Sequence, residues 1–147
     1  MMARTDRAKR TDPARAESYA EVGRRLLHAA RAITEQGDAR HASALAILAV
    51  HSVIAYADAV AIHSGGKRST SADHAAVLSL LRDVLGNRLT DKIAKEIQRV
   101  ITEKDKFEYQ GYVATMPEAR SILDRAERVG AWCEEWMNTT ARLRDGR

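Results

Sequence analysis

The sequence predicts an all-α fold, an up-and-down four-helix-type bundle with one extra helix, so that five helices are expected. Three observations predict it. Alanine is abundant while the chain holds only 8 Gly and 2 Pro, a composition that suits packed helices. Apolar residues recur at steps of three and four, and no segment alternates apolar and polar residues as a strand does. The 147 residues match a single domain, which we expect at 13–141 between flexible basic tails at 1–12 and 142–147.

The first helix has a clear predicted start. Asp12 is a suitable N-cap, and Pro13 suits the first turn, where a missing N–H costs nothing. Gly37 predicts the end of this helix. The predicted core stripe consists of the apolar residues between these points that follow the helical repeat: Tyr19, Val22, Leu26, Ala29 and Ile33.

The second predicted helix, at residues 42–62, is apolar nearly all round, which is typical of a helix surrounded by neighbours. A membrane helix has a similar length, but many alanines lower the hydrophobicity here, and His51, Tyr56 and Asp58 interrupt the run. We therefore expect the central helix of a bundle and no membrane span. The charged N-terminus has no apolar run behind it, so we expect no signal peptide and a cytoplasmic protein.

The remaining elements follow from their caps. Residues 67–71 are polar and predict a loop, and Ser71 can cap a third helix that ends at Gly86. Thr90 can cap the fourth helix. The fifth is expected to open at Thr115-Met116-Pro117-Glu118, which has the spacing of a capping box.

Polar residues interrupt the apolar faces of two of these helices. His51 and Asp58 share one stripe of the second helix, and Lys104 occupies a position in the fourth where the period calls for an apolar residue. A buried carboxylate needs a partner, so we expect Lys104 to pair with Asp58. His51, Tyr56 or His74 could join them. The cluster is either a polar layer that fixes helix register or a set of acid–base or ligand-binding groups, and the sequence leaves both open.

Charge and composition exclude several functions. The net charge of +4 lies in the two tails, each of which contributes +2, so the predicted bundle is close to neutral. The net charge therefore says little about a nucleic-acid footprint on the bundle, although the basic tails could add weak, salt-sensitive attraction to RNA or DNA. The five histidines lie on different segments without a paired carboxylate–histidine motif, so we expect no metal and no cofactor. Gly65-Gly66-Lys67 lacks the spacing of a phosphate-binding loop.

Three further side chains have two interpretations each. Cys133 is the single cysteine, and we expect a core thiol in preference to a reactive one. Trp132 and Trp136 lie one helical turn apart on the fifth helix. They are expected in the core, although an exposed pair would indicate an interface.

The sequence resembles the HEPN domains, small prokaryotic helical bundles that include toxin ribonucleases and partners of nucleotidyltransferases. Three segments carry the resemblance: the alanine-rich helix at 46–62 with Val50-His51-Ser52-Val53-Ile54-Ala55-Tyr56-Ala57-Asp58, the helix start Ser71-Ala72-Asp73-His74, and Lys104-Asp105-Lys106-Phe107-Glu108-Tyr109. With the helix order, the similarity covers roughly residues 14–138.

The resemblance implies where a functional site would lie. Active members carry an Arg, then four to six residues, then a His late in the bundle, and two such sites meet across a dimer to cleave RNA. Here Lys104 stands in the place of the Arg and Tyr109 in the place of the His. Lysine lacks the bidentate fork of arginine, and tyrosine is a poorer acid or base at neutral pH than histidine. Arg68 and His74 also have this spacing, but they lie before the third helix, and we interpret that match as chance.

The leading hypothesis is a non-catalytic or weakly catalytic HEPN-like module, a homodimer in RNA- or stress-linked regulation. Lys104, Lys106 and Tyr109 are expected on its relevant surface, with His51, Asp58 and His74 as further candidates. The alternatives are an active endoribonuclease toxin, neutralised by a nucleotidyltransferase-like antitoxin, and a helical adaptor with no nucleic-acid role.

Overall fold

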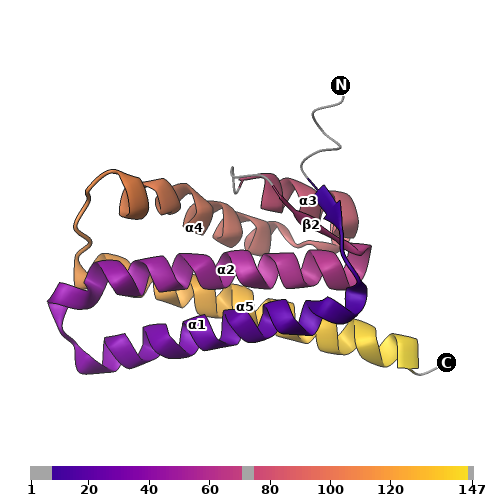
Figure 1. Ribbon diagram of the computed structural model, residues 1–147, viewed down its shortest axis with the longest axis horizontal. Coiled ribbons are helices and arrows are strands. Elements are labelled where there is room, and N and C mark those ends of the chain that lie inside the picture. The colour runs from indigo at the N-terminus through magenta and orange to yellow at the C-terminus, as the bar shows by residue number, and fades with distance from the viewer. Residues whose placement is uncertain (1–7, 71–74, 146–147) are drawn as a thin grey trace.

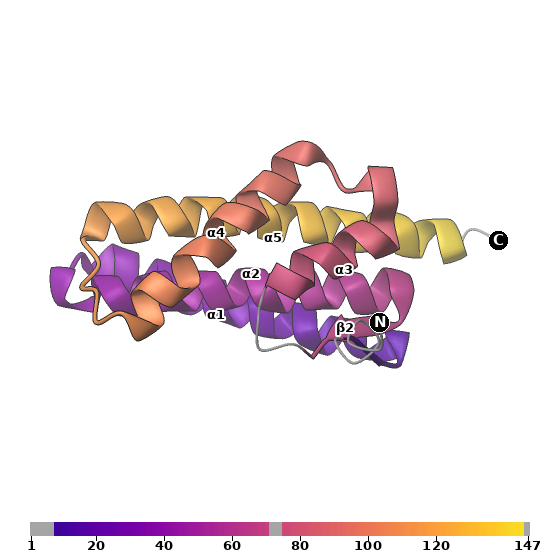
Figure 2. The same ribbon diagram turned by 90° about the horizontal axis from the view of Figure 1, so that it is seen from above.

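The computed structural model describes residues 8–70 and 75–145, without the side chains of Tyr109 and of residues 142–145. It confirms the all-α bundle. The helices are α1 (Ala16–Gln36), α2 (Ala42–Gly65), α3 (Ala75–Leu85), α4 (Asp91–Tyr109) and α5 (Met116–Asp145), and the strands are β1 (Ala8–Arg10) and β2 (Lys67–Ser69). The three long helices α1, α2 and α5 run along the length of the molecule, and α4 crosses them obliquely (Figures 1 and 2).

Helix α2 is the centre of the bundle, as predicted, because it packs against each of the other four helices. Fifteen of its residues are buried, so its near-continuous apolar surface is covered by protein. Among the described residues, the segment Ala39–Gly65 alone is long and apolar enough to cross a membrane, but 78% of its most apolar stretch is buried inside the bundle. A buried core helix of a folded domain can have the same length and apolar composition as a membrane span.

Three of the predicted caps, at Asp12, Thr90 and Thr115, are confirmed. Asp12 accepts a hydrogen bond from the backbone N–H of Ala14 and starts a short 3-10 turn ahead of α1. Thr90 accepts from the N–H of Ile93 at the start of α4. At the start of α5, the Thr115 N–H donates to Glu118 and the Glu118 N–H donates to Thr115, which is the reciprocal pairing of a capping box.

The predicted core stripe of α1 is wrong by about one residue. The buried residues are small, with one leucine among them: Ala16, Ala20, Gly23, Leu27 and Ala30. The predicted residues Tyr19, Leu26, Ala29 and Ile33 are only half-buried and Val22 is 51% exposed. Helix α1 contacts both α2 and α5, and small side chains allow the helix axes to approach closely, so the larger apolar residues lie on its flank.

The structure also differs from the expected tails. Ala8–Arg10 forms strand β1, which pairs antiparallel with β2, with Ala8 opposite Ser69 and Arg10 opposite Lys67. The strand therefore occupies part of the N-terminal tail, and β2 occupies part of the predicted polar loop. At the other end, α5 continues to Asp145. Three-residue strands carry too few positions for an alternating pattern to be read from the sequence.

Candidate functional site

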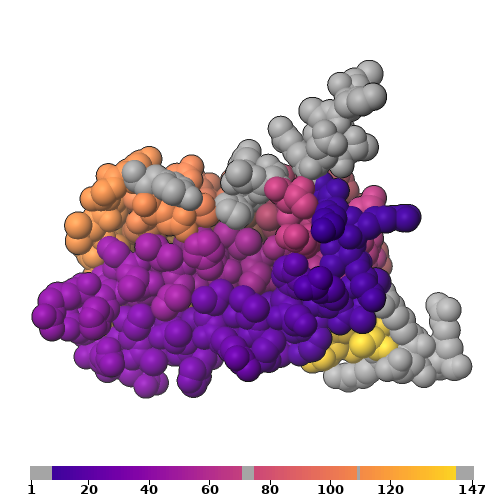
Figure 3. Space-filling view, in the orientation of Figure 1, coloured from indigo at the N-terminus to yellow at the C-terminus, as the bar shows by residue number. Residues whose placement is uncertain are grey.

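Lys104 lies inside the bundle, where α4 packs on α2, and takes part in a cluster with Glu108 and His51. The Lys104 side chain is 7% exposed, and its Nζ lies 3.0 Å from Glu108 Oε2. The other carboxylate oxygen, Glu108 Oε1, lies 2.7 Å from His51 Nε2. Glu108 is 14% exposed and the His51 side chain 43%, so the cluster runs from the core to the surface. Figure 3 shows surface atoms of α2 next to those of α4.

The expected pair between Lys104 and Asp58 does not form. Glu108 lies one turn after Lys104 on the same helix, which places the two side chains next to each other. Asp58 lies two turns beyond His51 along α2, roughly 10 Å further on. Of the three residues that could have joined the cluster, His51 does, through Glu108, and Tyr56 does not.

Asp58 has a different environment. Its Oδ1 atom is buried and has no hydrogen-bond partner within the described part of the chain. Burial raises the pKa of its carboxyl to about 7, and the positive charge of Arg68 opposes that shift. Arg68 lies on β2, with its guanidinium 5.9 Å from the ring centre of Tyr19. Asp58 therefore faces the small sheet and not the seam between α2 and α4.

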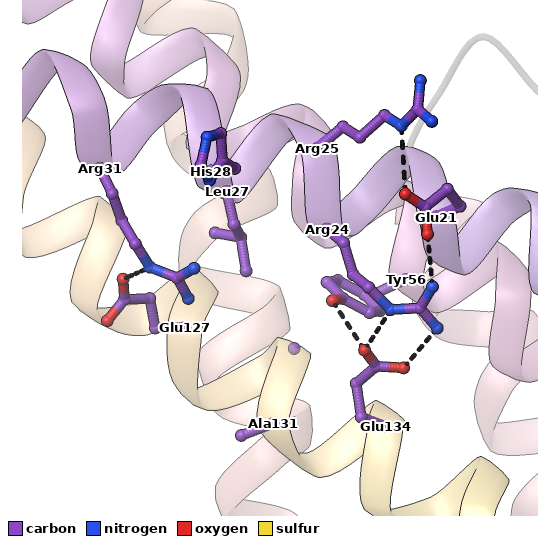
Figure 4. A pocket seen from close by; sticks show the side chains of 11 residues that line it. Glu21, Arg24, Arg25, Leu27, His28, Arg31, Tyr56, Glu127, Ala131 and Glu134 are labelled. Atoms are coloured by element: carbon purple, nitrogen blue, oxygen red, sulfur yellow. Dashed lines mark hydrogen bonds and ion pairs between the residues drawn. The ribbon is translucent and has the colours of Figure 1, made fainter.

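Tyr56 lies at the base of a groove of about 540 Å³ between α1 and α5 (Figure 4). Its hydroxyl lies 3.4 Å from Glu134 Oε2, and Arg24 donates to both oxygens of Glu134, at 2.6 and 3.0 Å. Hydrogen bonds with Glu134 and two other carboxylates raise the pKa of Arg24 above its ordinary value. Burial and the Glu134 charge raise the pKa of Tyr56, so its phenol stays neutral and cannot serve as a base near neutral pH.

A second ion pair spans the groove seven residues away. Arg31 Nε lies 2.6 Å from Glu127 Oε1, one heptad from the Arg24–Glu134 pair on each helix. Between the two pairs, Ala131 provides only a methyl group (Figure 4), and the space in front of Gly130 is occupied by the Tyr56 ring. The groove is therefore a gap between two bridges, in which opposite charges balance.

Two glycines hold the Tyr56 ring. A Cβ atom on Gly23 would lie 2.8 Å from Tyr56 Cδ2, and a Cβ on Gly130 would lie 2.9 Å from Tyr56 Cε2. Both distances are shorter than van der Waals contact. The ring therefore packs directly against the backbones of α1 and α5, and this contact sets the spacing of α1, α2 and α5.

Lys106 lies near the end of α4, where its charge is shared by nearby carboxylates. Its Nζ lies 3.4 Å from Glu118 and 3.8 Å from Glu103, and 4.2 Å from the ring centre of Tyr112. Glu118 also accepts from the Tyr112 hydroxyl at 2.6 Å. Hydrogen bonds, that of Tyr112 first, lower the pKa of Glu118 to about 2. Lys106 is half-exposed, so of the predicted cations it is the one that reaches solvent.

Two predicted site residues lie outside what the structure describes. His74 falls in the segment 71–74, and the side chain of Tyr109 is not described, although its backbone ends α4. The predicted cap at Ser71 and the spacing match of Arg68 with His74 also involve residues outside the described part of the chain. The structure brings together His51 and Lys104 and places Asp58 and Lys106 elsewhere.

The cysteine and the tryptophans are placed clearly. Cys133 is fully buried, as expected, and burial raises the pKa of its thiol. The rings of Trp132 and Trp136 stack with centres 5.7 Å apart, and both are half-buried. Trp136 donates to Ser64 at 2.8 Å, and Arg88 lies over its ring. The pair is thus anchored in the fold, with part of its surface in solvent.

Sequence reasoning missed Glu108 and the Arg24–Glu134 bridge. Glu108 could have been predicted as the partner of Lys104, because it follows Lys104 by four residues and side chains at this spacing are neighbours on a helix. The bridge joins residues 110 positions apart, and no periodicity indicates which of many surface charges will meet. In the described part of the chain, no three His, Cys, Asp or Glu side chains lie close enough to hold a metal ion.

The cluster at Lys104 has a defined chemistry. A carboxylate held by a buried ammonium on one side can orient the imidazole of His51 on the other, which leaves the second ring nitrogen for solvent or a ligand. Comparison of the chain with protein-family models, with curated proteins and with solved structures finds no significant match.

Proposed function

We propose that this protein is a non-catalytic helical module, similar to the HEPN domains, that acts by binding in RNA- or stress-linked regulation. The observation that supports the non-catalytic part is the burial of Lys104. Its ammonium lies 3.0 Å from Glu108 and its side chain is 7% exposed, so its charge is neutralised within the protomer. A cation that serves phosphate must instead meet the ligand with its charge available.

Homodimer formation and a cytoplasmic location belong to the same proposal. The homodimer rests on the resemblance, and the location rests on the charged N-terminus that has no apolar run behind it. A nucleotidyltransferase-like partner belongs to the toxin alternative. A helical adaptor without a role in nucleic-acid biology fits the burial of Lys104 equally well, and RNA retention separates it from the leading proposal.

One observation favours a second function, a weak endoribonuclease. His51 is 43% exposed and its Nε2 is held 2.7 Å from Glu108. An imidazole oriented by a carboxylate is the arrangement of a general base. In this case His51, and not Tyr109, would carry the acid–base chemistry.

The experiment is an RNA cleavage assay on the purified full chain, with expression toxicity as a second readout. Three proteins are compared: wild type, His51→Ala and Glu108→Gln. We expect no cleavage by wild type beyond that of His51→Ala, and salt-sensitive retention of labelled RNA. If the wild type cleaves RNA and a folded His51→Ala variant does not, the weak endoribonuclease replaces the non-catalytic module as the proposed function. Absence of both cleavage and RNA retention would leave the adaptor.

A further inference from the structure

A second groove, of about 360 Å³, lies between α4 and α5. Its apolar lining comes from Phe107, Pro117 and Ile122, and Ser121 opens it to solvent. The charged lining consists of three cations and two carboxylates: Arg99, Lys106, Arg125, Glu103 and Glu118. The groove thus combines an apolar base with a charged rim of positive excess.

The carboxylates in and beside this groove lie close to neighbouring cations or donors. Of the two that line it, Glu103 lies 3.8 Å from Lys106. Glu118 accepts from Tyr112 and Thr115 and lies 3.4 Å from Lys106. Glu96, 12% exposed, pairs with Arg125 at 2.9 Å and with Arg128 at 3.3 Å. Their negative charge is therefore neutralised within the fold and offers little to a partner.

Three cations on α4 form no such ion pairs with the described residues. Lys92, Lys95 and Arg99 are exposed and make no ion pair or hydrogen bond to any part of the chain that the structure describes. With Lys106 they follow one another at steps of three, four and seven residues, which places them along one side of the helix over about 21 Å. Steps of three, four and seven are the repeat with which one helix faces another.

We propose that this groove and the cations beside it, the α4–α5 docking site, bind an acidic amphipathic helical segment of a partner protein. Carboxylates of that segment at the same helical repeat meet Lys92, Lys95 and Arg99, and an apolar side chain enters the space over Ile122 and Phe107. This proposal does not depend on the function proposed above.

An acidic peptide fits this site better than RNA. Glu96 and Glu103 interrupt the row of cations, so it does not form the continuous positive strip that tracks a phosphate backbone. The exposed aromatic ring beside the groove, Tyr112, already has Lys106 at 4.2 Å from its centre, and a base that stacked on that face would have to displace this contact. Separate cations beside an apolar base match the mixed side chains of a peptide.

The test measures fluorescence anisotropy of a labelled peptide of about 15 residues with Glu at steps of three and four and Leu on the adjacent side. A peptide of equal composition with the Glu residues spread around the helix is the sequence control. A labelled RNA of similar charge is the second probe. We expect the first peptide to bind saturably and more tightly than its control, with binding weakened by salt, and we expect any RNA retention to be unchanged in Arg99→Glu.

Two variants and one control variant locate the contact. Arg99→Glu should weaken binding about tenfold, while Arg82→Glu, which reverses an exposed charge on α3, should leave it unchanged. Ser121→Tyr adds bulk to the groove without changing charge and should also weaken binding about tenfold. Circular dichroism checks that all three remain helical.

Several results would overturn the proposal: no saturable binding of the amphipathic peptide, equal binding of its control, or an equal loss in Arg82→Glu. Tighter binding of the RNA, lost in Arg99→Glu, would assign the same surface to nucleic acid instead.

Discussion

Two regions of this bundle bring a polar group into the interior in different ways. At the α2–α4 seam the buried group is a charge, the Lys104 ammonium, and Glu108 neutralises it while His51 carries the network to the surface. At the α1–α5 groove the buried group is the neutral phenol of Tyr56, and the ions Arg24 and Glu134 remain half-exposed. The comparison teaches that a lysine in an apolar stripe is not by itself a ligand site, since its counter-ion can come from its own helix.

The largest expected effect is at the buried charge. Lys104→Met should lower the free energy of unfolding by about 2–3 kcal/mol, because Glu108 then keeps its charge in a largely buried position. The double variant Lys104→Met/Glu108→Leu should recover most of this loss, since both ions are removed together. Chemical denaturation of the wild type and the two variants measures the values. A single variant as stable as the wild type would show that the pair contributes nothing.

The second effect tests the glycine contact of Tyr56. Gly23→Ala should destabilise the protein by about 2 kcal/mol through overpacking, although the same change in an open helix position stabilises it. In a Tyr56→Leu background the cost of Gly23→Ala should fall toward zero, because the atoms that the new Cβ meets are those of the ring. An unchanged cost in that background would place the clash elsewhere.

The smallest expected effect concerns Asp58, a partly buried residue whose Oδ1 atom is buried and has no hydrogen-bond partner among the residues that the structure describes. Its pKa is raised to about 7 in the fold, above the value of about 3.9 in an unfolded chain. The folded state therefore binds the proton more tightly, and stability falls as the pH rises from about 4 through 7. Asp58→Asn should gain about 1–2 kcal/mol at pH 8 and little at pH 4. Thermal unfolding at the two pH values checks this, and an equal gain at both would refute the link to ionisation.

Much of the fold could be predicted from the sequence. The caps at Asp12, Thr90 and Thr115 are local hydrogen bonds, so the nearby sequence predicts them. The central position of α2 is predicted by its sequence, which is apolar on nearly all sides. The stripe of α1 was missed because burial there depends on how closely Ala20 and Gly23 let neighbouring helices approach, which no hydrophobicity pattern records. Strand β1 was missed for a similar reason, since its partner β2 lies almost sixty residues away.

The candidate site was predictable only in part. Lys104 and His51 were identified as polar residues on apolar faces, and they do share one cluster. The carboxylate that connects them is Glu108, whereas Asp58 was predicted as the partner of Lys104. Charge balance alone does not say which acidic residue is nearest. The groove at Tyr56 depends on Gly130 and on Glu134 from α5, a meeting of distant segments that only the packed structure determines.

We propose that the charge of Lys104 serves the fold and not a ligand. This proposal is tested most directly by RNA retention and cleavage with the double variant Lys104→Met/Glu108→Leu, compared with the wild type at equal thermal stability. We expect the same RNA retention and the same absence of cleavage for both proteins. Loss of RNA retention or cleavage in the folded double variant would contradict it and make the cluster a functional site.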